Sequence, residues 1–294
     1  MAKLVDAAGL GPVGRKSVGG SSPPARTLSL SVCIAGATGW TGRALVRAVL
    51  DAPDLTLGSA VSRSAAGKDV GEALGGDALG VPVYGTVSEA LDGIDVLVDY
   101  TSATAVKANV LAAIEAGVAV VVGSSGLTAE DFAEIDTAAR GRSVGAIASG
   151  NFSLTAAMCQ AAALLAARHL PQWEVIDYAD AKKPDVPSGT ARELAERLGE
   201  VRRPELGHPI ESLHGPKEAR GATVGGTQIH SVRLPSFVVS TEVVFGLPDE
   251  RLTIRHDAGG TPEPYVAGTL VAVRRAPSLV GLTRGLDTLL LGSG

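Results

Sequence analysis

The segment Leu28-Ser-Leu-Ser-Val-Cys-Ile-Ala-Gly36-Ala-Thr-Gly39-Trp-Thr-Gly42 decides the fold of this chain. The part before the glycines has the length and apolar composition of a buried β-strand. Gly36 permits a tight turn, Gly39 lets the backbone approach a pyrophosphate, and Gly42 allows a helix to pack closely on the strand. The pattern therefore predicts a dinucleotide site at a helix N-terminus, where negative charge is favoured. Its residues are Gly36, Ala37, Thr38, Gly39, Trp40, Thr41 and Gly42. A glycine-rich turn without a ligand is the alternative.

Strands and helices alternate through the rest of the first half. The expected strands cover 54–62, 94–100, 118–122 and 144–148, with a short helix ending near Leu91, and the expected longer helices cover 42–50, 106–116 and 128–140. Such alternation is typical of right-handed β-α-β units in a parallel sheet. We therefore expect an α/β fold class with a Rossmann-type dinucleotide-binding domain over residues 28–150.

The pattern changes after residue 150. A long Ala-rich helix over 153–170 precedes a strand at 174–178 and a helix at 191–198, and only strands are expected between 227 and 256. These elements predict a second, α+β domain with a mixed or antiparallel sheet over 151–261. Residues 262–294 are expected to form C-terminal helices, over 264–275 and 279–291, that return to the first domain.

Composition narrows the classes of partner. The net charge of −5 and the isoelectric point near 5.6 argue against nucleic acid and against an anionic membrane surface. No apolar run reaches the ~20 residues that a membrane-spanning helix needs. Cys33 and Cys159 lie in apolar runs without metal-ligand spacing, which indicates small core residues in a reducing compartment. We therefore expect a cytoplasmic protein without a metal site.

The first 27 residues differ from the rest of the chain. They are rich in Gly, Ser, Pro and Arg, and they lack both helical periodicity and the apolar segment of a secretory signal. They resemble the chance translation of a transfer-RNA gene upstream of the true start. Residues 1–27 are therefore expected to be a disordered leader without function.

The end of the second expected strand bears on the choice of cofactor. Proteins that bind NAD place an Asp or Glu there to hold the ribose hydroxyls. This chain has Ser62 and Arg63 instead. A serine does not repel a 2′-phosphate, and a guanidinium can pair with it bidentately. The pattern predicts NADPH in preference to NADH, unless Arg63 is only a solvated loop charge.

Two polar turns follow the next buried strands. They contain Gly123, Ser124 and Ser125 in one case, and Ser149, Gly150, Asn151 and Phe152 in the other. Because ligands of parallel sheets bind at the carboxyl ends of the strands, these residues are expected to line the nicotinamide pocket. Ordinary β-α turns are the alternative.

The substrate side is predicted from Asp177-Tyr-Ala-Asp-Ala-Lys-Lys183-Pro-Asp-Val-Pro-Ser188-Gly-Thr190-Ala. Ser188 has the position of a helix cap. The hydroxyls of Ser188 and Thr190 and the N–H groups of Gly189 and Thr190 could form an anion site that the helix dipole reinforces. Lys183 could add a positive contact or a proton. A capped helix beside a solvated lysine is the alternative.

Several motifs in a fixed order resemble the dihydrodipicolinate reductase family from residue 29 to the end. They are the Gly36–Gly42 turn, Gly123–Gly126, Asn151-Phe-Ser153, Lys183–Ala191, Ile229–Pro235, Glu242–Gly246 and Leu252–His256. The resemblance implies hydride transfer from a nicotinamide to a cyclic imine dicarboxylate in lysine biosynthesis through diaminopimelate. It also implies a homotetramer formed through the sheet of the second domain.

Two departures from the family pattern concern the proton donor. The family has two adjacent histidines where this chain has Ala179 and Asp180, and an arginine where this chain reads Gly259-Gly-Thr-Pro-Glu-Pro264. An exposed Asp180 is ionised at neutral pH and repels a dicarboxylate. Either Lys183 or a water that it holds donates the proton, or the substrate is a different imine. An imine with a single carboxylate or with an amine would suit a site that has fewer positive groups and in which Asp180 contacts the substrate.

Other motifs are weaker. Tyr178 and Lys182 match the Tyr-x-x-x-Lys pattern of short-chain dehydrogenases, but the prolines that follow oppose the helix which that pair requires. Neither cysteine sits at a helix N-terminus, where a nucleophilic cysteine would be expected. Three hypotheses stay open: the lysine-pathway reductase, a paralogous imine reductase or amino-acid dehydrogenase, and a non-catalytic NADPH-binding sensor.

Overall fold

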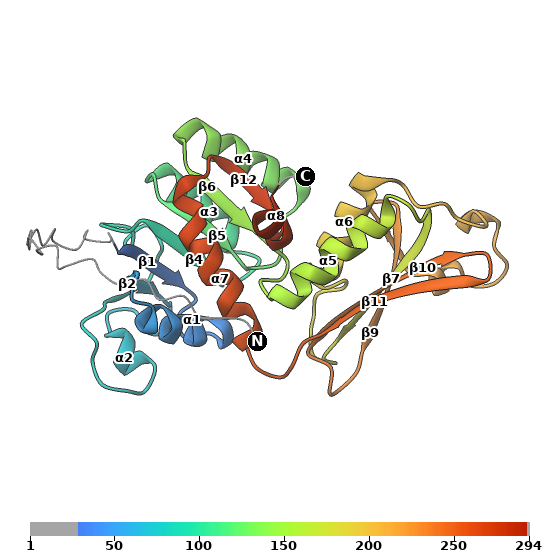
Figure 1. Cartoon of the computed structure of the whole chain (residues 1–294). Coiled ribbons are helices and arrows are strands. Elements are labelled where there is room, and N and C mark those ends of the chain that lie inside the picture. The colour runs from blue at the N-terminus through green and yellow to red at the C-terminus, as the bar shows by residue number, and fades with distance from the viewer. Residues whose placement is uncertain (1–28, 293–294) are drawn as a thin grey trace, which may run out of the picture.

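The computed structural model describes residues 29–292, in which two sheets lie side by side (Figure 1). The larger sheet has seven parallel strands in the order β12-β6-β5-β4-β1-β2-β3. Its strands are β1 (Leu30–Ala35), β2 (Leu55–Val61), β3 (Val83–Tyr84), β4 (Val96–Asp99), β5 (Ala119–Val122), β6 (Gly145–Ala148) and β12 (Gly281–Arg284). The predicted Rossmann-type sheet is confirmed.

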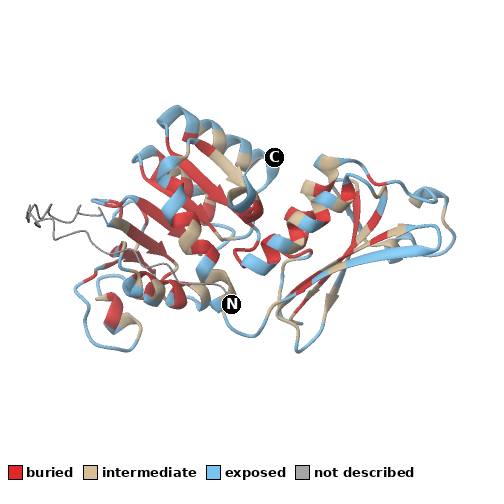
Figure 2. Ribbon diagram, viewed as in Figure 1, coloured by how far each residue is buried: buried red, intermediate tan, exposed pale blue. Residues whose placement is uncertain are grey.

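The helices of this part cover the sheet in two groups. Helix α1 (Trp40–Asp51) packs on α7 (Glu263–Arg275), whereas α3 (Val106–Glu115) packs on α4 (Ala129–Arg142). From β1 the strand order runs to β2 and β3 on one side and to β4, β5 and β6 on the other. Because each crossover is right-handed, the helices of the two directions lie on opposite faces of the sheet. Strands β4, β5 and β6 are buried along their whole length, as Figure 2 shows. Their continuous apolar runs are typical of parallel strands covered on both faces.

The smaller sheet is mixed, as predicted, in the order β11-β10-β7-β9-β8. Only the β7–β9 pair is parallel among the described strands of this sheet. Its strands are β7 (Gln172–Ala179), β8 (Ala222–Val224), β9 (Thr227–Arg233), β10 (Val239–Leu247) and β11 (Glu250–Asp257). Helices α5 (Leu154–Ala167) and α6 (Gly189–Val201) supply Ala163, Ala191 and Leu194 to a core that includes Trp173 and Phe245.

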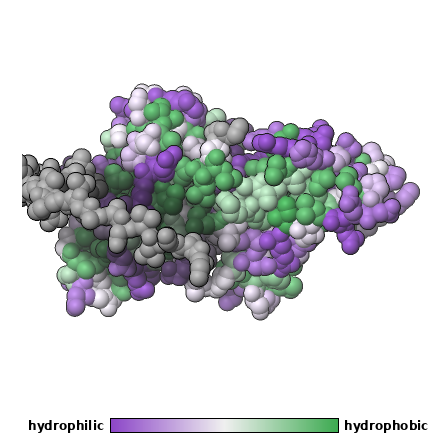
Figure 3. Space-filling view, in the orientation of Figure 1, coloured by the Kyte–Doolittle hydropathy of each residue, from purple (hydrophilic) through white to green (hydrophobic). Residues whose placement is uncertain are grey.

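Helix α5 has large apolar side chains on its exposed face. Leu154, Met158 and Leu165 are large side chains that stay exposed on it, and Figure 3 shows hydrophobic side chains gathered over this helix. None of the described helices is long and apolar enough to cross a membrane.

The prediction for the C-terminal segment was partly wrong. Residues 279–291 do not form one helix: β12 pairs with β6, and α8 (Leu286–Leu291) follows. Gly281 and Gly285 have φ of +84° and +85°, a backbone conformation that a helix cannot contain. The residues between them instead form hydrogen bonds with β6, which satisfies the backbone groups of β12. Near Leu91 there is a turn rather than a helix, and a short α2 (Val70–Ala73) lies upstream. The leader expected over residues 1–27 lies outside the described residues.

Candidate active site

The glycine turn between β1 and α1 has no room for side chains at two positions. Gly36 has φ of +85°, and a Cβ there would lie 2.3 Å from the carbonyl oxygen of Tyr100. A Cβ on Gly42 would lie 2.1 Å from the oxygen of Gly36. No side chain caps the first turn of α1 at Gly39. The turn therefore presents backbone N–H groups at a helix N-terminus, which is the arrangement that binds a pyrophosphate.

The end of β2 is tied to this turn. The hydroxyl of Ser62 is buried and lies 2.8 Å from the hydroxyl of Thr38. Arg63 follows Ser62 and is exposed, and no acidic side chain stands at residues 62–64. Arg43, which sequence reasoning missed, donates from Nε to the oxygen of Thr38 at 2.9 Å. Its position directly after the third glycine could have pointed to it.

A cavity of about 220 Å³ joins the two halves of the molecule. The predicted cofactor-side residues that line it are Trp40, Thr41, Gly123, Ser124, Ser125, Ser149, Gly150, Asn151 and Phe152, and Tyr100 and Tyr265 line it as well. The predicted substrate-side residues that line it are Lys183, Ser188, Gly189 and Thr190, and Asp185 and Val239 line it as well. The remaining residues of the predicted nucleotide site, including the buried Ala37, lie in the turn or at the end of β2 outside this cavity. The predicted cofactor and substrate groups thus face one cleft.

The first turn of α6 forms one wall of that cavity. Ser188 caps α6 by accepting the N–H of Ala191, and its own hydroxyl donates to Asp177 at 2.6 Å. The hydroxyl of Thr190 donates to the oxygen of Gly150 at 3.0 Å. Both hydroxyl protons are therefore engaged within the protein. The N–H groups of Gly189 and Thr190 lie in the first turn of α6, where helix N–H groups have no partner within the helix. Anion binding by these N–H groups and by the two hydroxyls stays a prediction.

The carboxylate of Asp177 bonds to Ser188 at the start of α6, a role that the sequence did not predict. It is fully buried at the end of β7. Its carboxylate accepts hydrogen bonds from the N–H and hydroxyl of Ser188, from the hydroxyl of Ser231 and from Arg233, which lies 2.8 Å away. Arg233 also donates to the backbone carbonyl oxygen of Asp185 at 2.8 Å. A charged pair with this many hydrogen bonds fixes the loop between β7 and α6.

Lys183 reaches the cavity from the same loop. Its Nζ lies 2.8 Å from Oδ1 of Asp185, and both side chains are about three-quarters buried. The other oxygen of Asp185 is buried and accepts no hydrogen bond from the described residues. Because an ammonium carries three donor hydrogens, Lys183 keeps donors for a ligand while Asp185 orients it. Asp185 was missed, although it lies within the motif that drew attention to Lys183.

Comparison with known proteins agrees with this arrangement. Residues 30–152 match the family described as dihydrodipicolinate reductase, N-terminus, and residues 151–289 match dihydrodipicolinate reductase, C-terminus. The chain belongs to the dihydrodipicolinate reductase family. It is 39% identical over 265 residues to the 4-hydroxy-tetrahydrodipicolinate reductase of Desulfitobacterium hafniense, which covers 89% of this chain and 98% of that protein. The corresponding protein of Thermosynechococcus vestitus is 38% identical over 268 residues.

Solved structures with the same fold include one dihydrodipicolinate reductase. The dipicolinate-bound dihydrodipicolinate reductase from Paenisporosarcina sp. TG-14 matches with a TM-score of 0.69 at 28% identity, over 89% of this chain and 99% of that one. GenD2 in complex with NAD matches at 16% identity with a TM-score of 0.59, which shows the fold alone. The chain is thus an NAD(P)H-dependent reductase by family.

Neither Ala179 nor Asp180, which stand where the dihydrodipicolinate reductase pattern has two histidines, lines the cavity. Ala179 is fully buried in β7. Oδ1 of Asp180 accepts the N–H of Lys182 at 2.8 Å, and its backbone oxygen accepts the N–H of Lys183 at 3.0 Å. In this structure Asp180 shapes the turn that carries Lys183. Its contact with substrate stays a prediction.

The histidines are spread over the second half of the chain. His256 is buried, with Nε2 3.0 Å from the hydroxyl of Thr155, and burial lowers its pKa. His230 pairs with Glu174 at 2.7 Å on the far sheet. Within residues 29–292, no three His, Cys, Asp or Glu side chains are grouped so that they could hold a metal ion.

Proposed function

We propose that this chain is a 4-hydroxy-tetrahydrodipicolinate reductase of lysine biosynthesis through diaminopimelate, which reduces a cyclic imine dicarboxylate with a nicotinamide nucleotide. One observation carries the proposal: Lys183 and the N–H groups at the start of α6 share a cavity with the cofactor-side turns at Gly123 and Gly150. The family and its relatives supply the reaction class.

The nucleotide would lie along the carboxyl ends of the parallel strands. The N–H groups after Gly39 would bind the pyrophosphate, and the turns at Gly123–Ser125 and Ser149–Phe152 would enclose the nicotinamide. The absence of Cβ atoms at Gly36 and Gly42 fits a backbone cradle for a phosphate. When bound, the nicotinamide supplies the hydride.

The substrate would be held by its charge. The N–H groups of Gly189 and Thr190 would bind one carboxylate, and the ammonium of Lys183 would bind a second acidic group or hold the proton that completes the reduction. Asp185 keeps Lys183 directed into the cavity through the 2.8 Å ion pair. Asp177 keeps Ser188, and thus the helix end, in place.

NADPH is the proposed cofactor, with NADH as a poorer alternative. The argument is that Ser62 replaces an acidic residue and that Arg63 and Arg43 bring positive charge to the 2′-phosphate side of the turn. The ratio of kcat/KM for the two cofactors tests it. Arg63→Ala should lower this ratio by about tenfold or more, as expected for a lost charged hydrogen bond, and Arg47→Ala on the exposed side of α1 serves as the control. A preference of the wild type for NADH contradicts the proposal.

The activity is tested by supplying the condensation product of pyruvate and aspartate semialdehyde and following NADPH oxidation. Turnover at ordinary enzyme rates is the expected result. A second candidate is favoured by Ala179 and Asp180, which provide no histidine acid: a reductase of another imine or an amino-acid dehydrogenase. It would be silent with this substrate but active with other imines. Tight NADPH binding without any turnover would identify a sensor.

The family resemblance further predicts a cytoplasmic homotetramer assembled through the smaller sheet. Strand β11 at the edge of that sheet is exposed over most of its length, which leaves this edge open to another copy. Light scattering on the purified protein checks the predicted mass of four chains.

A further inference from the structure

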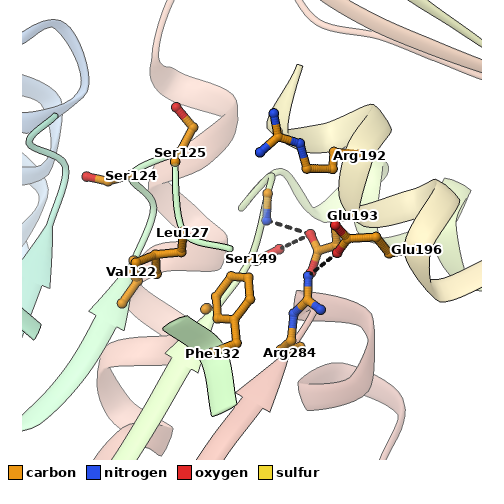
Figure 4. A pocket seen from close by; sticks show the side chains of 14 residues that line it. Val122, Ser124, Ser125, Leu127, Phe132, Ser149, Arg192, Glu193, Glu196 and Arg284 are labelled. Atoms are coloured by element: carbon orange, nitrogen blue, oxygen red, sulfur yellow. Dashed lines mark hydrogen bonds and ion pairs between the residues drawn. The ribbon is translucent and has the colours of Figure 1, made fainter. Parts of the chain in front are cut away.

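Helix α6 carries a buried acid that has no place in the mechanism above. Glu193 is 5% exposed. Its Oε2 accepts the backbone N–H of Gly150 at 2.5 Å and lies 3.5 Å from the hydroxyl of Ser149. Figure 4 shows Glu193 directed from α6 toward Ser149, beside a small cavity of about 50 Å³ that shares Ser124, Ser125 and Gly150 with the larger one.

The residues around Gly150 leave α6 little freedom to shift. A Cβ on Gly150 would lie 2.5 Å from the oxygen of Gly189 and 2.9 Å from Oε2 of Glu193. The oxygen of Gly150 accepts the hydroxyl of Thr190, and its N–H is held by Glu193. Both polar groups of Gly150 thus bond to α6, which also carries the anion-binding end.

Charged side chains from three elements face Glu193. Arg197 of α6 pairs with Asp287 of α8, and Arg284 of β12 pairs with Glu196 of α6 at 2.8 Å. Arg192 of α6 lines the same small cavity. Burial is the largest effect and raises the pKa of Glu193 from 4.5 to about 7. The N–H of Gly150 and the guanidiniums of Arg197 and Arg284 favour the carboxylate, whereas Asp287 opposes it. A buried acid of this kind lowers stability when it ionises. Buried acids with raised pKa values are concentrated at functional sites.

We propose that Glu193 is a positioning residue for the reduction: it holds the Ser149–Phe152 turn against the first turns of α6 and so fixes the distance between the nicotinamide side and the substrate's carboxylate. The inference rests on the proposed function of that cavity. The inference goes beyond that function because it assigns the relative position of the Ser149–Phe152 turn and α6 to the buried carboxyl of Glu193. The carboxylate accepts a stronger hydrogen bond than the neutral acid, so the turn is held more firmly as pH rises through 7.

The first test needs no ligand. The amide hydrogen of Gly150 should exchange with solvent at least about tenfold faster in Glu193→Ala than in the wild type, since a hydrogen bond of about 1.4 kcal/mol protects it. Glu193→Gln keeps an acceptor and should stay within a factor of a few of the wild type. Glu200→Gln, the same change at an exposed site of α6, should match the wild type. Equal exchange in all four proteins overturns the proposal.

The second test separates positioning from a merely structural role. With NADPH present, Glu193→Ala should weaken binding of the planar dicarboxylate dipicolinate about tenfold and raise KM for the imine similarly, while the Kd of NADPH alone changes less than twofold. Glu193→Gln should partly restore both and lose the rise of kcat/KM through pH 7 that the wild type shows. Three results would each overturn the proposal. They are unchanged dipicolinate binding in Glu193→Ala, an equal loss of NADPH affinity in that variant, and a pH dependence of kcat/KM that persists in Glu193→Gln.

The two tests also separate this inference from the proposed function. If the wild type does not reduce the imine, the proposed function fails. The exchange of Gly150 and the binding of dipicolinate still decide whether Glu193 holds the two halves in register.

Discussion

The cofactor-side turn and the substrate-side loop of this protein are built in different ways. The turn Gly36–Gly42 depends on positions where no side chain fits, and most of its contacts come from β1, β2 and α1, which follow one another in the chain. The carbonyl of Tyr100, just after β4, is the exception. The loop 180–188 is held by Arg233, which lies far from it in sequence, and Thr190 just after the loop bonds to the equally distant Gly150. A local site can be recognised from sequence, whereas an assembled one requires the fold.

The largest effect is expected at Lys183, where the two regions meet. Lys183→Ala should lower kcat/KM for the imine by about 10²–10⁴-fold, the range for a lost proton donor or charged contact. The Kd of NADPH should change little because Lys183 belongs to the assembled loop. Lys182→Ala next to it is the control, since Lys182 is exposed. Steady-state kinetics decide the matter, and a change below about tenfold would remove Lys183 from the chemistry.

The local turn can be broken by one methyl group. Gly36→Ala should raise the Kd of NADPH about 100-fold and lower stability by about 3 kcal/mol, because a positive φ and a clash with Tyr100 combine. Gly67→Ala provides a matched control: Gly67 also has positive φ, +82°, but nothing lies within 4 Å of its Cβ position. If both variants lose stability equally, strain rather than the close approach explains Gly36. Fluorescence titration and thermal unfolding give the two quantities.

The assembled loop should be weakened by a change at Asp177, which bonds to Ser188 and Arg233. Asp177→Asn leaves Arg233 without its buried carboxylate and weakens the support of Ser188, which should destabilise the protein by about 2–4 kcal/mol. KM for the imine should rise, and the Kd of NADPH should not. Denaturant unfolding and kinetics measure these effects. An equal loss of NADPH affinity would show that the two regions are not independent.

The pH dependence of stability sharpens the comparison at Glu193. Its pKa in the folded protein, about 7, lies above its usual value of 4.5, so the folded state favours the neutral acid. The resulting stability is fully present below pH 4.5 and is lost as pH rises through 7. Glu193→Gln lacks this loss and should be more stable than the wild type above pH 7, by about 3 kcal/mol at most. Urea unfolding at several pH values tests this, and a constant difference across pH would contradict the shifted pKa.

The smallest effect is expected at Asp180. If it only shapes the turn through the N–H of Lys182, Asp180→Asn keeps an acceptor and should change kcat/KM less than about threefold. A larger change, above all an altered preference among imines, would support the prediction that Asp180 contacts substrate. Assays with the dicarboxylate imine and with an amine-bearing analogue distinguish these outcomes.

Much of the fold was predictable, and particular segments show why. Strand β5 was expected from its apolar run, and the start of α6 from Ser188, because burial and capping leave local patterns. The segment 279–291 was misread as one helix, since β12 exists only through its pairing with β6. Asp185 and Glu193 were missed for a similar reason, because their partners Lys183 and Gly150 gain meaning only after folding.

By itself, the sequence determined the α/β class, the glycine turn for a nucleotide and the resemblance to dihydrodipicolinate reductases. These depend on residue size, backbone freedom and periodicity, which act between neighbours in the chain. Only the tertiary structure decided that the hydroxyls of Ser188 and Thr190 are already bonded, that Asp180 lies in a turn, and that Glu193 joins α6 to Gly150. Hydrogen bonds between distant segments depend on how the segments pack, and local patterns do not encode that.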